Sequence, residues 1–109
     1  MAKTSIEVGV AFTPVNLSDY SNGGIVSQQL TKSEAGNVTL FAFDEGQGLS
    51  EHSAPYDALV HVIDGEAEVI IGGESNTIVA GDMILMPANI PHALNAPKPF
   101  KMILTMIKG

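Results

Sequence analysis

Short β-rich runs, none longer than eight residues, recur along most of this 109-residue chain and are separated by turn signals. They cover residues 25–30, 38–43, 58–63, 66–71, 77–79, 84–86, 92–95 and 100–107. No stretch keeps a helical period of apolar residues over three turns, so helix is expected to be minor. Because evenly spaced short strands are typical of sandwiches and barrels, this spacing predicts an all-β fold.

The clearest turn signal is Asp64-Gly65, which lies between the runs at 58–63 and 66–71. An Asp-Gly pair between two runs of this kind is the strongest short-range indication of a β-hairpin. The pair Gly72-Gly73 and the tripeptide Ala80-Gly81-Asp82 predict two further turns.

The length of the chain leaves room for one hydrophobic core and therefore for one domain. Residues 1–23 are broken up by proline, glycine and asparagine, and we expect them to form an N-terminal arm with one short strand near residues 6–12. Residues 24–109 are expected to form the barrel domain.

Twelve Asp and Glu residues stand against five lysines, and arginine is absent. An acidic chain of this kind repels a phosphate backbone, so we expect no nucleic-acid partner. The N-terminus has no signal-peptide pattern, and the longest apolar run is far shorter than the roughly 20 residues of a membrane helix. With no cysteine either, we expect a cytoplasmic protein without a membrane partner.

Two stretches resemble the conserved motifs of the cupins. The first motif reads glycine, five residues, His, any residue, His, three or four residues, Glu, six residues, glycine. Gly46, His52 and Gly65 match it, whereas Ala54 and Ala58 occupy the positions of the second His and the Glu.

The second cupin motif reads glycine, five residues, Pro, any residue, Gly, two residues, His, three residues, Asn. Gly81, Pro87 and His92 match it, while Asn89 replaces the glycine and Ala96 the final Asn. Asparagine tolerates positive φ better than other non-glycine residues, so we expect the turn at Asn89 to be kept.

The resemblance implies a small single-domain cupin of the RmlC-like type, cupin type 2. Such a chain forms a jelly-roll β-barrel, also called a double-stranded β-helix. Cupins carry a metal on three His and one Glu, and the family ranges from dioxygenases and isomerases to storage and sugar-binding proteins. Cupins of this size commonly pair through edge strands, so the resemblance also implies a homodimer.

Alternation along the strands places His52 and His92 on the inward face, on strands that the resemblance makes neighbours. Each of the two is either a structural histidine hydrogen-bonded to a backbone carbonyl or a residue that binds a metal or a small molecule. His61 has the opposite parity, so it is an outward or interface residue unless a bulge turns it inward.

Two histidines fall short of the three or four protein ligands of a zinc site and of the two His and one carboxylate of a non-haem iron site. Asp57 and Tyr56 are the nearest substitutes. We therefore treat a divalent metal (Zn, Fe, Ni or Mn) on His52 and His92 as one open alternative.

The two alanines also open space in an apolar barrel. We predict a ligand site made by His52, Tyr56, Val60, Met86 and His92. Val62, Met83, Met102 and Met106 are further candidates, either as lining or as plain core filling.

Three functions stay open on the sequence. The first is a non-catalytic module that binds a small organic ligand in the barrel. The second is a metal-dependent enzyme of the dioxygenase or isomerase type that uses His52 and His92. The third is a structural dimer module.

Overall fold

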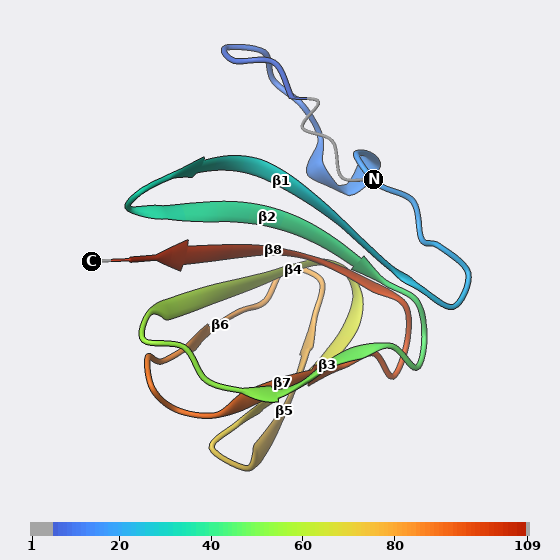
Figure 1. Ribbon diagram of the computed structural model, residues 1–109. Helices are drawn as coiled ribbons and strands as arrows, with labels where there is room; N and C mark the ends of the chain where they lie inside the picture. The colour runs from blue at the N-terminus through green and yellow to red at the C-terminus, as the bar shows by residue number, and fades with distance from the viewer. Residues whose placement is uncertain (1–5, 109) are drawn as a thin grey trace.

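The computed structural model describes residues 6–108 and is almost entirely β-structure (Figure 1). The strands are β1 (Ile25–Ser33), β2 (Gly36–Phe43), β3 (Gly48–His52), β4 (Asp57–Ile71), β5 (Glu74–Val79), β6 (Met83–Met86), β7 (His92–Asn95) and β8 (Phe100–Ile107). A single turn of 3-10 helix, η1 (Pro14–Asn16), precedes them. The predicted all-β fold is confirmed. Within residues 6–108 we find no helix with the length and apolar character needed to cross a bilayer.

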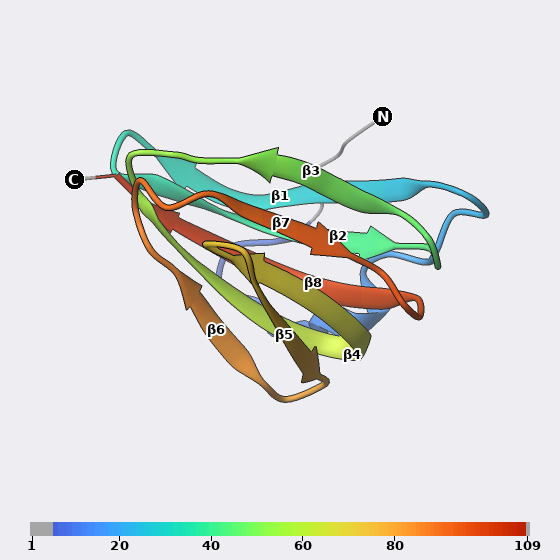
Figure 2. The ribbon, with the colours of Figure 1, turned by 90° about the horizontal axis from the view of Figure 1, so that it is seen from below.

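All strand pairs are antiparallel, and they form two sheets that curl around one core (Figures 1 and 2). The first sheet has the order β1-β2-β8-β4-β6, and the second has the order β5-β4-β7-β3. Strand β4 belongs to both sheets, because its first half pairs with β6 and β8 and its second half with β5 and β7. This arrangement is the jelly-roll barrel that the sequence predicts.

The hairpin predicted at Asp64-Gly65 is wrong, because β4 runs through this pair without reversing. The register against β8 shifts between Val62 and Asp64, which marks a β-bulge, and Gly65 has φ +78°. A bulge followed by a left-handed glycine bends a strand instead of ending it. The Asp-Gly pair is therefore the corner at which β4 passes from one sheet to the other.

Two other segments differ from the prediction. Residues 6–12 contain no strand, and the short regular element of the arm is η1, where Pro14 supplies the φ of a first helical position. The pattern of β-rich runs does not predict strand β3, since its second half is the polar run Ser50-Glu51-His52, and only the cupin resemblance places His52 on a strand.

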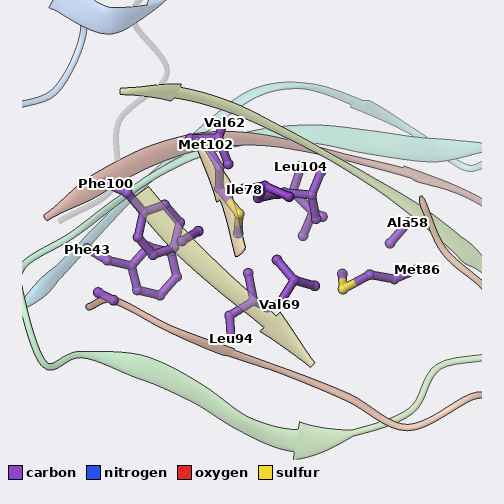
Figure 3. Packing of buried hydrophobic residues seen from close by; sticks show 13 residues of the cluster. Phe43, Ala58, Val62, Val69, Ile78, Met86, Leu94, Phe100, Met102 and Leu104 are labelled. Atoms are coloured by element: carbon purple, nitrogen blue, oxygen red, sulfur yellow. The ribbon is translucent and has the colours of Figure 1, made fainter. Parts of the chain in front are cut away.

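The core lies between the two sheets and is made of alternate inward residues (Figure 3). At one end, the rings of Phe43 and Phe100 stack with centroids 4.6 Å apart and an interplanar angle of 9°. At the other end lie Ala58 and Met86, which are cross-strand partners on β4 and β6. The barrel is thus filled by aromatic rings at one end and by a small and a flexible side chain at the other.

The arm is fastened to the outside of the first sheet by a polar cluster. The Tyr20 hydroxyl donates a hydrogen bond to Asp64 Oδ2 at the corner of β4. Lys101 Nζ donates to the Val15 carbonyl at 2.7 Å and lies 5.0 Å from the centroid of the Tyr20 ring. Burial and the Asp64 carboxylate together raise the pKa of Tyr20.

The corner predicts a strong position dependence for glycine substitutions. A Cβ on Gly65 would collide with the Pro99 carbonyl and Phe100 Cα, whereas a Cβ on Gly73, at φ +85°, meets nothing within 4 Å. Both changes to alanine cost about 1 kcal/mol for the left-handed backbone, and Gly65→Ala adds about 1 to 3 kcal/mol for the collision. Urea unfolding of the two variants measures this difference. Equal losses of unfolding free energy in Gly65→Ala and Gly73→Ala would contradict the proposed corner.

The hydrogen bond from Tyr20 to Asp64 should make part of the free energy of unfolding depend on pH. Tyr20→Phe should lower the free energy of unfolding by about 1 to 2 kcal/mol, since Asp64 loses its donor. A raised phenol pKa means that folding favours the protonated form, so this contribution is present below pH 10 and is lost as pH rises above it. Urea titrations between pH 8 and 11 should therefore show that the free energy of unfolding of the natural chain declines more steeply with pH than that of the Tyr20→Phe variant.

Candidate functional site

Two connections close the end of the barrel where Ala58 and Met86 lie, and we call this end the mouth. One connection, residues 53–56, leads from His52 at the end of β3 to the start of β4. The other, residues 87–91, leads from Met86 at the end of β6 to His92 at the start of β7. The mouth is therefore bounded by His52 and His92 on one sheet and by Ala58 and Met86 on the other.

Backbone and side-chain hydrogen bonds hold the two connections together. The Asn89 amide donates to the Ala54 carbonyl at 2.7 Å, and the Ala88 amide donates to Asp57 Oδ1 at 2.8 Å. Asn89 has φ 67°, so the predicted left-handed turn is confirmed at this position. Asp57, which we considered as a substitute metal ligand, instead fixes the position of the neighbouring connection. No local sequence signal indicates this contact, because the two residues are far apart in the chain.

His52 and His92 are direct cross-strand partners on β3 and β7, which confirms that these strands are neighbours. Their rings meet edge to face, with centroids 4.5 Å apart and an interplanar angle of 75°. His92 is only 3% exposed, whereas His52 is an exposed residue. The pair therefore extends from the barrel interior to the solvent.

Each histidine is held by a backbone carbonyl two residues earlier. The His52 Nδ1 lies 2.8 Å from the Ser50 carbonyl oxygen, and the His92 Nδ1 lies 3.1 Å from that of Ile90. A carbonyl only accepts, so Nδ1 must carry the proton in both rings. In the neutral tautomer this leaves a lone pair on each Nε2, and within residues 6–108 neither Nε2 has a hydrogen-bond partner.

Burial and the neighbouring His52 hold the pKa of His92 below its usual range, although the Ile90 carbonyl acts in the opposite direction. Desolvation is the larger cause, because the charged imidazolium loses water in the barrel wall. His92 is therefore neutral at pH 7 and offers Nε2 as an acceptor.

The remaining predicted ligand residues lie at different depths. Tyr56 is half-buried in the first connection, and the Lys108 ammonium lies 5.5 Å from its ring centroid. Val60 and Met86 are 0% and 2% exposed and belong to the core cluster, so they present almost no surface at the mouth. That a ligand contacts these residues stays a prediction.

The other candidates for lining separate into two groups. Val62 and Met102 are fully buried in the core, and Met106 packs against it. Met83 is 53% exposed and pairs with His61 on the outside of the first sheet, so it does not line the interior. The outward parity predicted for His61 is the observed one, since its neighbours Ala58, Val60 and Val62 alternate with it and are buried.

The donor set does not fit the metal site of the cupin pattern. Among the residues described, no three His, Cys, Asp or Glu side chains come together in a way that would hold an ion. The position of the pattern's glutamate is Ala58, which is 4% exposed and packed in the core. Of the pattern's four donors, His52 and His92 therefore supply two nitrogen atoms, and the other two positions carry none.

Comparison with known proteins supports the architecture. No curated protein matches the chain. Among solved structures, a conserved protein of unknown function from Streptococcus pyogenes is 34% identical, with a TM-score of 0.91, covering 95% of this chain and 91% of that one. A cupin 2 conserved barrel domain protein from Leptotrichia buccalis is 37% identical, with a TM-score of 0.83. This match covers 86% of our chain and 46% of the other.

A cupin superfamily protein from Desulfitobacterium hafniense shares the fold at 23% identity, with a TM-score of 0.85, covering 98% of this chain and 97% of that one. The family model described as Cupin domain matches residues 39–107, which is well over half of the chain and includes both motif stretches. The chain belongs to the cupin domain family.

Proposed function

We propose that this chain binds a small organic ligand at the mouth of its barrel, with His52 and His92 as the polar contacts. The observation that carries the proposal is the histidine pair itself. Both Nδ1 atoms are fixed by backbone carbonyls, and the rings lie 4.5 Å apart, so two oriented Nε2 acceptors are held in place before a ligand arrives. Polar groups oriented in advance reduce the entropy lost on binding.

The core side chains nearest the mouth suit an apolar part of such a ligand. Ala58 and Met86 lie side by side at this end of the core, while the stacked Phe43 and Phe100 fill the opposite end (Figure 3). A methionine side chain has three rotatable bonds and repacks easily around a ligand. Small-molecule sites combine apolar surface with a few placed polar groups, and the mouth offers this combination.

These contacts favour an apolar or aromatic ligand with one or two polar groups. At neutral pH the Nε2 of His92 accepts hydrogen bonds, so a hydroxyl or a protonated acid is its natural partner. An anionic group beside His92 would favour the imidazolium and raise the pKa that burial has lowered. An acid is therefore bound together with a proton, and its affinity increases as pH falls.

A thermal-shift screen of small aromatic acids tests this proposal. We expect stabilisation that grows as pH falls from 8 to 6 and continues to grow below 6.5, because the pKa of His92 is lowered from its usual 6.5. The variant His52→Ala/His92→Ala should lose about 1 to 3 kcal/mol of binding free energy, a typical value for two hydrogen bonds to a charged or polar ligand.

His61→Ala is the matched control, because it removes an imidazole from the outside of the same barrel. It should leave both the shift and its pH dependence unchanged. If the same compounds stabilise all three proteins equally at every pH, the histidine pair does not bind them.

The second candidate function is a metal-dependent enzyme of the dioxygenase or isomerase type. One observation favours it: histidines that ligate a metal usually donate their other ring nitrogen to a backbone carbonyl or carboxylate, as both do here. The shortage of donors counts against it, since two imidazoles leave the ion to water or substrate.

Restoring the missing donors separates the two candidates. We expect the natural chain to hold much less than one equivalent of Zn, Fe, Ni or Mn after purification, and Ala54→His/Ala58→Glu to gain metal affinity. Without metal this variant should lose about 2 kcal/mol or more of stability, because a carboxylate enters the core at Ala58. Added metal should recover that loss, whereas Ala54→His/Ala58→Gln should not respond. A full equivalent of tightly held metal in the natural chain would favour the enzyme.

A further inference from the structure

The inner surface of the first sheet carries a lysine in the row of residues that crosses the mouth. In this row the successive cross-strand partners are Lys32 on β1, Asn37 on β2, Met106 on β8, Ala58 on β4 and Met86 on β6. Cross-strand partners point to the same face of a sheet. Because Ala58 and Met86 are buried in the core, Lys32 lies on the inward side, at the exposed edge of the sheet.

A second lysine, Lys108, lies one step nearer the opening than this row. Lys108 follows Met106 by two residues, and the alternation of side chains along a strand therefore directs it inward. The Lys108 amide donates a hydrogen bond to the Ala35 carbonyl at 2.6 Å, so the chain keeps the direction of β8 up to this residue. Tyr56 precedes Ala58 by two residues and has the same parity. The Lys108 ammonium lies 5.5 Å from the centroid of the Tyr56 ring, as this alternation requires.

The charge of the Lys108 ammonium is available to a ligand. An aromatic ring attracts an ammonium group through its π electrons but does not neutralise it. Among residues 6–108, no carboxylate forms an ion pair with Lys108 or with Lys32. Asp57, which follows Tyr56 in the chain, faces outward and accepts a hydrogen bond from the Ala88 amide.

The second sheet brings the histidine pair to the same end of the barrel. In Figure 1 the end of β8, the β1–β2 turn and the connections β3–β4 and β6–β7 all lie at the left. The row of cross-strand partners on the second sheet is His52 on β3, His92 on β7, Ile71 on β4 and Glu74 on β5. Glu74 is the carboxylate of this row, and it lies two strands from His92, or roughly 10 Å along the sheet. A ligand at the mouth therefore meets imidazoles from one sheet and an ammonium group from the other.

The charges of the chain restrict the class of ligand that suits this arrangement. The chain has a formal net charge of −7 and no arginine, so the bidentate guanidinium group that favours phosphate is absent. A single ammonium is a compact charge that suits a carboxylate. Packed sheets lie about 10 Å apart, so one small carboxylate can contact either the histidine pair or Lys108. A ligand with two carboxylates can contact both.

We propose that the ligand of the mouth is a small dicarboxylate, with one carboxylate at the pair His52 and His92 and the other at the Lys108 ammonium. Tyr56 is a positioning residue, because its ring holds the ammonium group at the opening. Lys32 adds to the positive potential that attracts an anion to this end of an otherwise acidic molecule. This inference rests on the proposed function, since it assigns the second polar contact of a ligand that the histidine pair binds.

Titration calorimetry at pH 6 with benzoate, isophthalate and terephthalate tests the second contact. Benzoate has one carboxylate, and the other two probes have two. We expect the natural chain to bind at least one of the dicarboxylates about fivefold more tightly than benzoate, as for a partly exposed ion pair. Lys108→Gln should abolish this advantage and leave the affinity for benzoate unchanged. Lys98→Gln is the matched control, because it removes the same charge before the start of β8, at the opposite end of that strand, and it should leave all affinities unchanged.

Two variants of Tyr56 test its positioning role. Tyr56→Phe keeps the ring and should keep the natural affinities, whereas Tyr56→Leu should weaken the binding of the dicarboxylate about twofold and leave benzoate unaffected. Circular dichroism should show that all variants are folded.

The outcomes distinguish this inference from the proposed function. Dicarboxylates that bind no more tightly than benzoate, or that keep their advantage in Lys108→Gln, would overturn the inference while the histidine site stands. An equal loss in Lys98→Gln would also overturn it, since net charge and not Lys108 would then be the cause. A natural chain that binds none of the three probes would overturn both the inference and the proposed function.

Discussion

The bend in β4 at Asp64-Gly65 is the constraint on which the rest of the barrel depends. Strand β4 contributes inward residues to both sheets. Val60 and Val69 therefore pack in the same core although they lie on opposite sides of the bend. The bend requires the positive φ of Gly65 and the close approach of Pro99, which leads into β8. The bulge also leaves Asp64 facing outward, where Tyr20 binds it and fastens the arm. The corner, the closure of the barrel and the position of the arm therefore have one local cause.

The same strand determines the composition of the mouth. Its first inward residue is Ala58, opposite Met86, and its last residue is Ile71, opposite His92. The first half of β4 thus supplies the apolar side of the mouth, and the end of its second half pairs with the strand that carries His92. Because His92 is inserted in the wall of a packed barrel, it loses water and its pKa falls, whereas the exposed His52 keeps its contact with solvent.

The sequence predicts the second half of the chain better than the first. Strands β7 and β8 were predicted at the residues where they occur, because proline or glycine borders each apolar run. Strand β3 was missed because its residues Ser50, Glu51 and His52 are polar, and only its pairing with β7 makes it a strand. The Asp-Gly pair is compatible with a hairpin or with a bulge, and only the partner strands decide between them. For the site, the cupin resemblance places His52 and His92 on neighbouring strands, and the sequence offers a backbone carbonyl as one partner for each ring, which the structure shows. The sequence does not predict that Val60 and Met86 are sealed in the core.

Ala58 explains why this barrel can keep its shape with two of the pattern's donors replaced. A carboxylate at this position would be 4% exposed among apolar side chains, and it would need an ion or several hydrogen-bond donors to offset the loss of water. Alanine needs neither, and Met86 and Met106 fill the space beside it. Within the described residues no fully buried side-chain nitrogen or oxygen lacks a hydrogen-bond partner, so the Nε2 of His92, which has no partner, keeps some exposed surface. The polar groups that remain at the mouth are His52 and His92, which the proposed function assigns to a ligand.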